Sequence, residues 1–116
     1  FERVIHHEVF HIINDQHKKL FNKNEWKKFN NLKFKYAECS TCTEKLGLDL
    51  YKKTDGFFTE YSMSTASEDM AEVYSHIVYL DAEKISQIRN LDEILNKKIS
   101  YIESKIKQID NSFIFK

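Results

Sequence analysis

The sequence predicts a mostly α-helical fold, and three observations support this prediction. Proline is absent and glycine occurs only at Gly47 and Gly56, so few positions favour the end of a helix. Apolar residues recur every three or four positions over several long stretches, as a buried helix face requires. One of these stretches starts with a capping-box pattern, which is typical of a helix N-terminus.

Composition places the chain among globular proteins. Hydrophobic residues make up 41% and charged residues 31% of the 116 residues, and this length suits one domain. The net charge is zero and the lysines are interspersed with acids, so no nucleic-acid partner is expected. No apolar run approaches the length of a membrane span. We expect residues 1–116 to form one domain. Because the chain starts at Phe1 and enters a helix at once, we expect it to be the C-terminal part of a longer unit whose upstream part is missing.

The first predicted helix covers residues 2 to about 20. Its histidines His7 and His11 lie one turn apart. We expect this helix to be buried through four apolar residues, which are Val4, Ile5, Ile12 and Ile13. A second, short helix is expected over residues 22–31, with Trp26 and Phe29 as its buried anchors and Asn24 as its cap.

Residues 32–58 show little periodicity, and we expect a loop with at most one short helix. This stretch contains Cys39 and Cys42 in the sequence C-S-T-C. A single C-x-x-C pair is compatible with a disulfide, a redox pair or half of a metal site. We favour a local disulfide or two free thiols. A disulfide would fit a secreted or extracytoplasmic protein, which the pair slightly favours.

The next predicted helix covers residues 65–80. Thr65 followed by Glu68 makes the capping box, and the buried side is supplied by Met70, Ala71, Val73, Tyr74, Ile77 and Val78. A long helical stretch follows Asp81, with a break expected near Asn90. We interpret it as a structural brace, because one face carries Ile85, Ile88, Leu91, Leu95, Ile99, Ile102, Ile106 and Ile109.

His7, Glu8 and His11 form the motif H-E-x-x-H in the first predicted helix. Histidines four residues apart project from one helix face, where their ring nitrogens can share one zinc ion. Zinc makes bound water acidic, and Glu8 beside His7 is placed to accept its proton. Chance gives this pattern in a chain of this composition with a probability of roughly one in fifty. A metal-free, hydrogen-bonded histidine pair is therefore the alternative.

A catalytic zinc site needs three protein ligands and one open position, so the motif requires a third ligand elsewhere. Glu68, Glu72 and His76 follow one another at i, i+4 steps and form one polar stripe on the helix of residues 65–80. Such a stripe can also be simply the solvated face of that helix. Asp69 and the two cysteines are further candidates, and the residues alone leave the choice open.

Two segments of the sequence resemble a known family. "HHEVFHIIND" and "YSMSTASEDMAEVY" are similar to the catalytic domain of anthrax lethal factor and its relatives, in the gluzincin class of zinc peptidases. They also resemble a broader group of bacterial zinc-binding metallopeptidases with an E-D-F-A-E-like second motif. Tyr61 precedes Glu68 by seven positions, as a tyrosine does in lethal factor. The resemblance covers residues 1 to about 80 and implies the helical C-terminal part of a zincin-like domain.

Carried over residue by residue, the resemblance implies that His7, His11 and Glu68 hold a Zn2+ ion. It makes Glu8 the general base and Tyr61 the hydroxyl that stabilises the oxyanion. Glu72 is then expected to support the site by orienting a ligand histidine.

The sequence therefore predicts a zinc metallopeptidase, with an endopeptidase favoured, that acts on a peptide or protein substrate. One alternative is a catalytically degenerate relative that serves as a binding or toxin-associated module. Another is a plain helical interaction domain with an accidental H-E-x-x-H. The two helices that carry the predicted ligands have to face each other for the first interpretation to hold.

Overall fold

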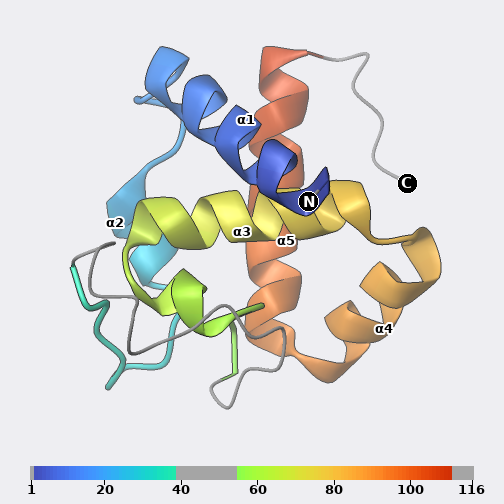
Figure 1. The fold of residues 1–116 in the computed structure, drawn as a ribbon. Helices are drawn as coiled ribbons and strands as arrows, with labels where there is room; N and C mark the ends of the chain where they lie inside the picture. Colours follow the sequence, from blue (N-terminus) through green and yellow to red (C-terminus); the bar gives the residue numbers. More distant parts are fainter. Residues whose placement is uncertain (1, 39–54, 111–116) are drawn as a thin grey trace.

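The computed structural model describes residues 2–38 and 55–110, and these residues are mostly helical (Figure 1). The helices in chain order are α1 (Glu2–Gln16), α2 (Lys23–Lys27), the 3-10 helix η2 (Glu60–Met63), α3 (Ala66–Tyr79), α4 (Ala82–Leu91) and α5 (Glu93–Ile109). The described residues contain no strand, which confirms the mostly α-helical prediction. Cys39 and Cys42 lie outside the described residues, so the disulfide remains a prediction.

The helix α3 lies at the centre of the fold. Figure 1 shows α1 crossing one side of α3 and α5 running behind it, with α4 packed beside α5. Phe10 from α1 fills the space between the layers, with its ring centroid 5.1 Å from Phe21 and 5.4 Å from Tyr74. Among the described residues, no helix combines the length and the apolar character that a membrane crossing needs.

The prediction of which face of α1 is buried was wrong for three of its four residues, whereas Ile13 is partly buried and packs against the core. Val4, Ile5 and Ile12 are 53%, 49% and 60% exposed, whereas His7 and Phe10 are the buried residues of this helix. Periodicity identifies the residues that share a helix face, but it does not identify the partner of that face. The side of α1 that carries His7 meets acidic side chains of α3, so this side turns inward and Val4, Ile5 and Ile12 face outward.

The predicted helix starts are confirmed in position, with two corrections of detail. The hydroxyl of Thr65 accepts a hydrogen bond from the amide of Glu68 and caps α3. The carboxylate of Glu68, however, bonds to histidines of α1 instead of closing a reciprocal capping box. The cap of α2 is Asn22 and not Asn24, because the Asn22 side chain accepts from the amides at the start of that helix.

The C-terminal brace consists of two helices joined at Asp92, two residues after the expected break. The Asp92 carboxylate accepts from the amide of Leu95 and caps α5. Leu95, Ile99, Ile102 and Ile106 are buried as expected. Leu91, by contrast, is 88% exposed, because it lies at the end of α4 where the chain turns and the helical register of the apolar face is interrupted.

A buried ion pair joins α3 to α5. Lys98 of α5 donates to Asp69 Oδ2 of α3 over 2.8 Å and to the carbonyl oxygen of Gly56 over 2.7 Å. The same carboxylate oxygen accepts from Trp26 Nε1 at 3.0 Å and from the hydroxyl of Tyr36 at 2.6 Å. Asp69 and Lys98 are both fully buried. Burial favours the neutral form of each group, raising the pKa of Asp69 and lowering that of Lys98, while their contact opposes both shifts.

Replacement of Lys98 should therefore destabilise the fold strongly. Lys98→Met leaves the Asp69 carboxylate buried without its cation, which typically costs about 3–5 kcal/mol. The free energy of unfolding, measured by denaturation in urea, should fall by this amount. Lys97→Met is the matched control, because Lys97 is exposed and only reaches Glu93 at 3.9 Å; it should change stability by less than about 1 kcal/mol. Equal effects of the two substitutions would contradict the buried pair.

Candidate metal centre

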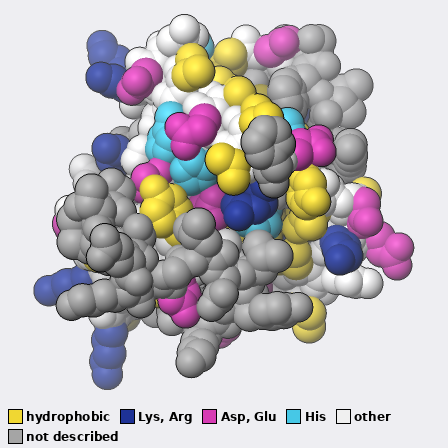
Figure 2. Space-filling model, viewed as in Figure 1, with side chains coloured by type: hydrophobic (Ala, Val, Ile, Leu, Met, Phe, Trp, Pro, Cys, Tyr) yellow, Lys and Arg dark blue, Asp and Glu magenta, His cyan; other side chains and the backbone are white. Residues whose placement is uncertain are grey.

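Three potential ligand atoms converge where α1 crosses α3. The Nε2 atoms of His7 and His11 lie 3.2 Å apart, and Glu68 Oε1 lies 3.1 Å from the first and 2.5 Å from the second. All three atoms lie within 4.8 Å of one another. Figure 2 shows histidine and acidic side chains gathered on this face of the molecule, with hydrophobic side chains around them. The structure thus brings His7, His11 and Glu68 together as the sequence predicted.

The chemistry of this donor set fits zinc. Two imidazole nitrogens and one carboxylate oxygen are the ligands of many catalytic zinc sites. A tetrahedral zinc ion with bonds of about 2.0–2.1 Å spaces its ligand atoms roughly 3.3 Å apart. The distances from His7 Nε2 to His11 Nε2 and to Glu68 Oε1 are already close to this spacing. These three residues could therefore hold a metal ion with small movements of their side chains.

Glu72 supports His7 from the side away from the three converging atoms. Nδ1 of His7 donates to Glu72 Oε2 over 2.7 Å, which fixes the orientation of the ring and directs Nε2 toward His11 and Glu68. Glu72 is itself held by two groups. Arg3 donates to Oε2 over 2.9 Å and the hydroxyl of Thr59 donates to Oε1 over 2.8 Å. The histidine-orienting contact expected of Glu72 is thus present.

The sequence did not predict that Arg3 and Thr59 contact Glu72. Arg3 lies four residues before His7, one turn away on the same side of α1, and this spacing is a signal that could have found it. Thr59 carried no such signal. It is far from Glu72 in the sequence, and only the fold brings its hydroxyl to the carboxylate.

Tyr61 reaches the centre from η2. Its hydroxyl donates a short hydrogen bond to Glu68 Oε2, the oxygen that does not face the histidines. Its ring centroid lies 5.7 Å from that of His7. Burial, the hydrogen bond to Glu68 and the negative charges of Glu68, Glu72 and Glu8 raise the pKa of Tyr61. The hydroxyl therefore keeps its proton at neutral pH and is a hydrogen-bond donor beside the centre.

Glu8 lies next to His7 on the solvent side of α1. Its side chain is exposed and has no hydrogen-bond or ion-pair partner among the described residues. Its negative charge is the last of the causes that raise the pKa of Tyr61. A carboxylate in this position is open to water and to a ligand that approaches from solvent.

Hydrogen bonds set the protonation of the metal-free centre. Burial acts to lower the pKa of His7, but the hydrogen bonds to Glu68 and Glu72 outweigh it and raise the value to about 9. Burial acts to raise the pKa of Glu68, but hydrogen bonds from His11 and His7 hold it well below its ordinary range. At neutral pH the metal-free centre therefore contains a protonated His7 between two carboxylates.

Two other candidates for the third ligand lie away from the three converging atoms. Asp69 faces the buried pair with Lys98 on another side of α3. His76 is buried, stacks on Phe58 with the ring centroids 4.3 Å apart, and bonds through Nδ1 to the carbonyl oxygen of Glu72. Burial lowers the pKa of His76 to about 4, so this ring is neutral and packs in the core.

These features define a helical domain with a histidine–histidine–glutamate centre suited to a metal ion. The chain belongs to the family described as "putative zinc-binding metallo-peptidase", whose model matches residues 1–113. This membership supports a peptidase acting on a peptide substrate. A search of curated proteins and a search of solved structures gave no match.

Zinc uptake should release a proton, because a histidine has to be neutral to bind a metal. At pH values below about 9, His7 of the metal-free protein is protonated, so zinc displaces that proton. The apparent zinc affinity should then rise with pH from 7 to about 9 and level off above that value. Zinc titrations at several pH values in two buffers of different ionisation enthalpy would measure this effect. An affinity that is flat above pH 7 would contradict it, since His7 would then titrate near its ordinary pKa of about 6.5.

The two glutamates of α3 should affect zinc binding to different degrees. Glu68→Gln removes a charged oxygen from the converging set, so the zinc affinity should fall most in this variant. Glu72→Gln leaves all three atoms in place and should cost about 10- to 100-fold, as loss of a group that orients a ligand does. Glu83→Gln, an equal charge change on the exposed side of α4, is the control. A larger loss in Glu72→Gln than in Glu68→Gln would overturn this ranking.

Proposed function

We propose that this domain hydrolyses peptide bonds with the help of a zinc ion. The observation that carries the proposal is the convergence of His7 Nε2, His11 Nε2 and Glu68 Oε1, with Glu8 adjacent to His7 on the solvent side. The family of the chain supports the same class of reaction.

His7, His11 and Glu68 would hold the zinc ion, and Glu72 would keep the His7 ring in its orientation. Zinc, when bound, supplies a Lewis acid that polarises the scissile carbonyl and lowers the pKa of water. The exposed carboxylate of Glu8 takes the proton of the attacking water. It later delivers this proton to the amine that leaves, so one residue serves as base and then as acid.

Tyr61 is the proposed donor to the oxyanion. Its raised pKa keeps the hydroxyl protonated, which a hydrogen-bond donor requires. In the resting state this hydroxyl bonds to Glu68 Oε2, so it has to exchange this partner for the substrate oxygen as the oxyanion forms. An interaction made only at that stage stabilises the transition state and not the substrate.

The finer assignment is also part of this proposal. We infer a gluzincin-type endopeptidase similar to the lethal factor catalytic domain. It rests on the order of H-E-x-x-H, Tyr61 and Glu68 and on the spacing of the last two, since Tyr61 precedes Glu68 by seven positions. The main alternative is a relative that holds zinc without cleaving peptides, as a binding or toxin-associated module. Bound zinc combined with no cleavage of a peptide library would favour that alternative.

The roles of Glu8 and Tyr61 are tested by variants that keep the ligands intact. Glu8→Gln should retain zinc and lose peptide hydrolysis by about 10²- to 10⁴-fold, the usual contribution of a general base. Tyr61→Phe should also retain zinc and should lower kcat with little change in KM. Zinc content by elemental analysis and turnover of a cleaved library peptide measure both effects. Parent-like turnover of Glu8→Gln would remove Glu8 from the mechanism.

A further inference from the structure

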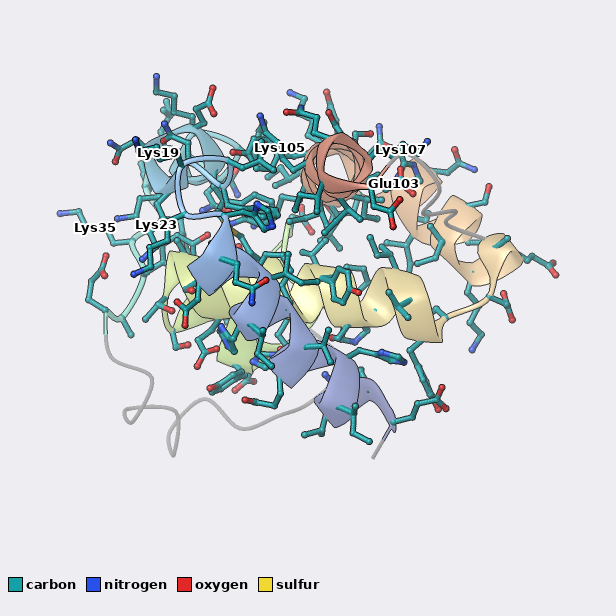
Figure 3. All side chains as sticks on the ribbon, turned by 90° about the horizontal axis from the view of Figure 1, so that it is seen from above. Lys19, Lys23, Lys35, Glu103, Lys105 and Lys107 are labelled. Atoms are coloured by element: carbon teal, nitrogen blue, oxygen red, sulfur yellow. The ribbon has the colours of Figure 1, made fainter. Side chains whose placement is uncertain are left out.

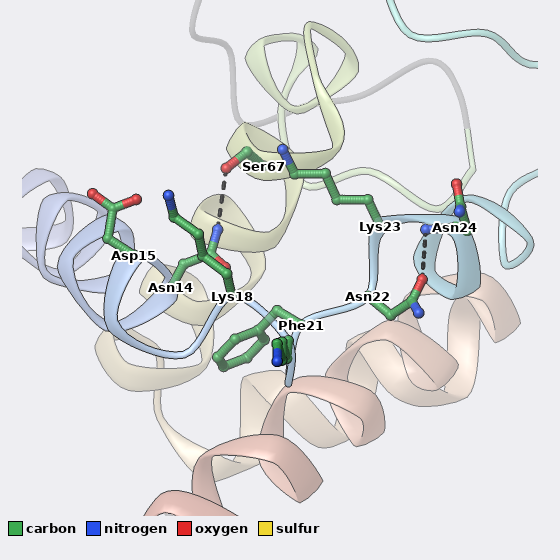
Figure 4. Close-up of a pocket in the computed structure, with 9 residues that line it drawn as sticks. Asn14, Asp15, Lys18, Phe21, Asn22, Lys23, Asn24 and Ser67 are labelled. Atoms are coloured by element: carbon green, nitrogen blue, oxygen red, sulfur yellow. Dashed lines mark hydrogen bonds between the residues drawn. The ribbon is translucent and has the colours of Figure 1, made fainter.

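A cavity of about 770 Å³ lies between the C-terminal end of α1, the following turn and the start of α2. Figure 4 shows its polar lining. The amide of Asn14 donates to the hydroxyl of Ser67 over 3.3 Å, and Asn22 caps α2 at the other side. None of these groups has a part in the proposed chemistry.

The cavity adjoins the metal centre. Asn14 follows His11 by three residues and so lies one turn further along the same side of α1. Ser67 directly precedes Glu68 in α3. The Asn14–Ser67 hydrogen bond thus spans the same pair of helices as the ligand atoms, one turn beyond them. A peptide bound over the metal centre in an extended conformation would reach the cavity within a few residues, because each residue spans about 3.3 Å.

The lining of the cavity is positively charged, although the chain as a whole has zero net charge. Lys18, Lys19 and Lys23 line it together with one acid, Asp15. Figure 4 shows Lys18 and Lys23 on either side of the Asn14–Ser67 hydrogen bond. These three lysines have no ion-pair partner among the described residues, so their ammonium groups are available to an incoming anion.

We propose that this cavity is a substrate subsite that takes acidic side chains of the peptide. The inference rests on the proposed peptidase function and adds a substrate class to it. Carboxylates of Glu or Asp would pair with the ammonium groups of Lys18, Lys19 and Lys23, and the side-chain amides at the rim would supply further donors. Peptides with acidic residues a few positions from the scissile bond are then the preferred substrates.

Binding can be measured apart from catalysis with the zinc-loaded Glu8→Gln protein. The probes are two fluorescein-labelled, alanine-based peptides that differ only in a central Glu-Glu or Gln-Gln pair. Fluorescence anisotropy should show tighter binding of the Glu-Glu peptide. Replacing Lys18, Lys19 and Lys23 by Gln should weaken that binding by about 10-fold, as the loss of several exposed ion pairs implies. Binding of the Gln-Gln peptide should change less than about twofold, and the advantage of the Glu-Glu peptide should disappear in about 1 M salt.

The control is a second triple variant with the same change in net charge, in which Lys84, Lys97 and Lys107 are replaced by Gln. These exposed residues belong to α4 and α5; Figure 3 shows Lys107 on the far side of α5 from Lys19 and Lys23. The control should bind both peptides like the parent, and both triple variants should keep their zinc.

Three results would overturn the subsite. The first is equal binding of the two peptides. The second is an equal loss in both triple variants, which would indicate a general charge effect. The third is inorganic phosphate that binds with the same lysine dependence while Glu-Glu and Gln-Gln peptides bind alike, which would make the cavity a phosphate site. Failure of the proposed function is seen separately, as absence of cleavage by the parent protein whatever the binding result.

Discussion

The structure depends on the contact of one imidazole ring with two carboxylates. His7 Nδ1 bonds to Glu72 and His7 Nε2 bonds to Glu68, and the two acids lie one turn apart on α3. Both nitrogens of a ring on α1 thus meet successive turns of the facing helix. This contact fixes the position of α1 along α3 and its rotation about its own axis. It also explains why aliphatic residues of α1 face outward, since turning them inward would break both hydrogen bonds.

The other side of α3 is held by a second polar cluster. Asp69, next to Glu68 in the sequence, faces the interior and gathers Lys98, Trp26 and Tyr36. These two neighbouring acids therefore contact different helices, because adjacent positions on a helix point about 100° apart. Glu68 bonds to the two histidines of α1, whereas Asp69 joins α3 to α5. Since a buried ion pair is costly to break, this cluster gives the turn of α3 that carries Glu68 a rigid support.

The charged residues around His7 compensate one another: His7 contacts Glu72, and Glu72 contacts Arg3. Arg3 donates to the same oxygen of Glu72 that accepts from His7, and it offsets the charge of this buried carboxylate. Glu72 can then orient the ring without placing an uncompensated negative charge beside it. The metal-free centre is stabilised by the proton on His7 between two acids. A zinc ion would occupy the same region and replace that proton, so metal binding and protonation compete for one set of atoms.

The sequence alone determined the helices and the residue types of the centre. The signals for the helices are local and do not depend on distant contacts. They are the absence of proline, the Thr65 cap and the period of apolar residues in α5. The sequence also determined the H-E-x-x-H motif and the stripe of Glu68 and Glu72. Only the tertiary structure decided which face of α1 turns inward, because that choice rests on hydrogen bonds to acids of α3 that lie 57 to 65 residues further along the chain. The tertiary structure likewise decided the contacts of Thr59, Arg3 and Lys98. Their partners lie 13 to 69 residues away in the chain, and no local pattern encodes such a distance.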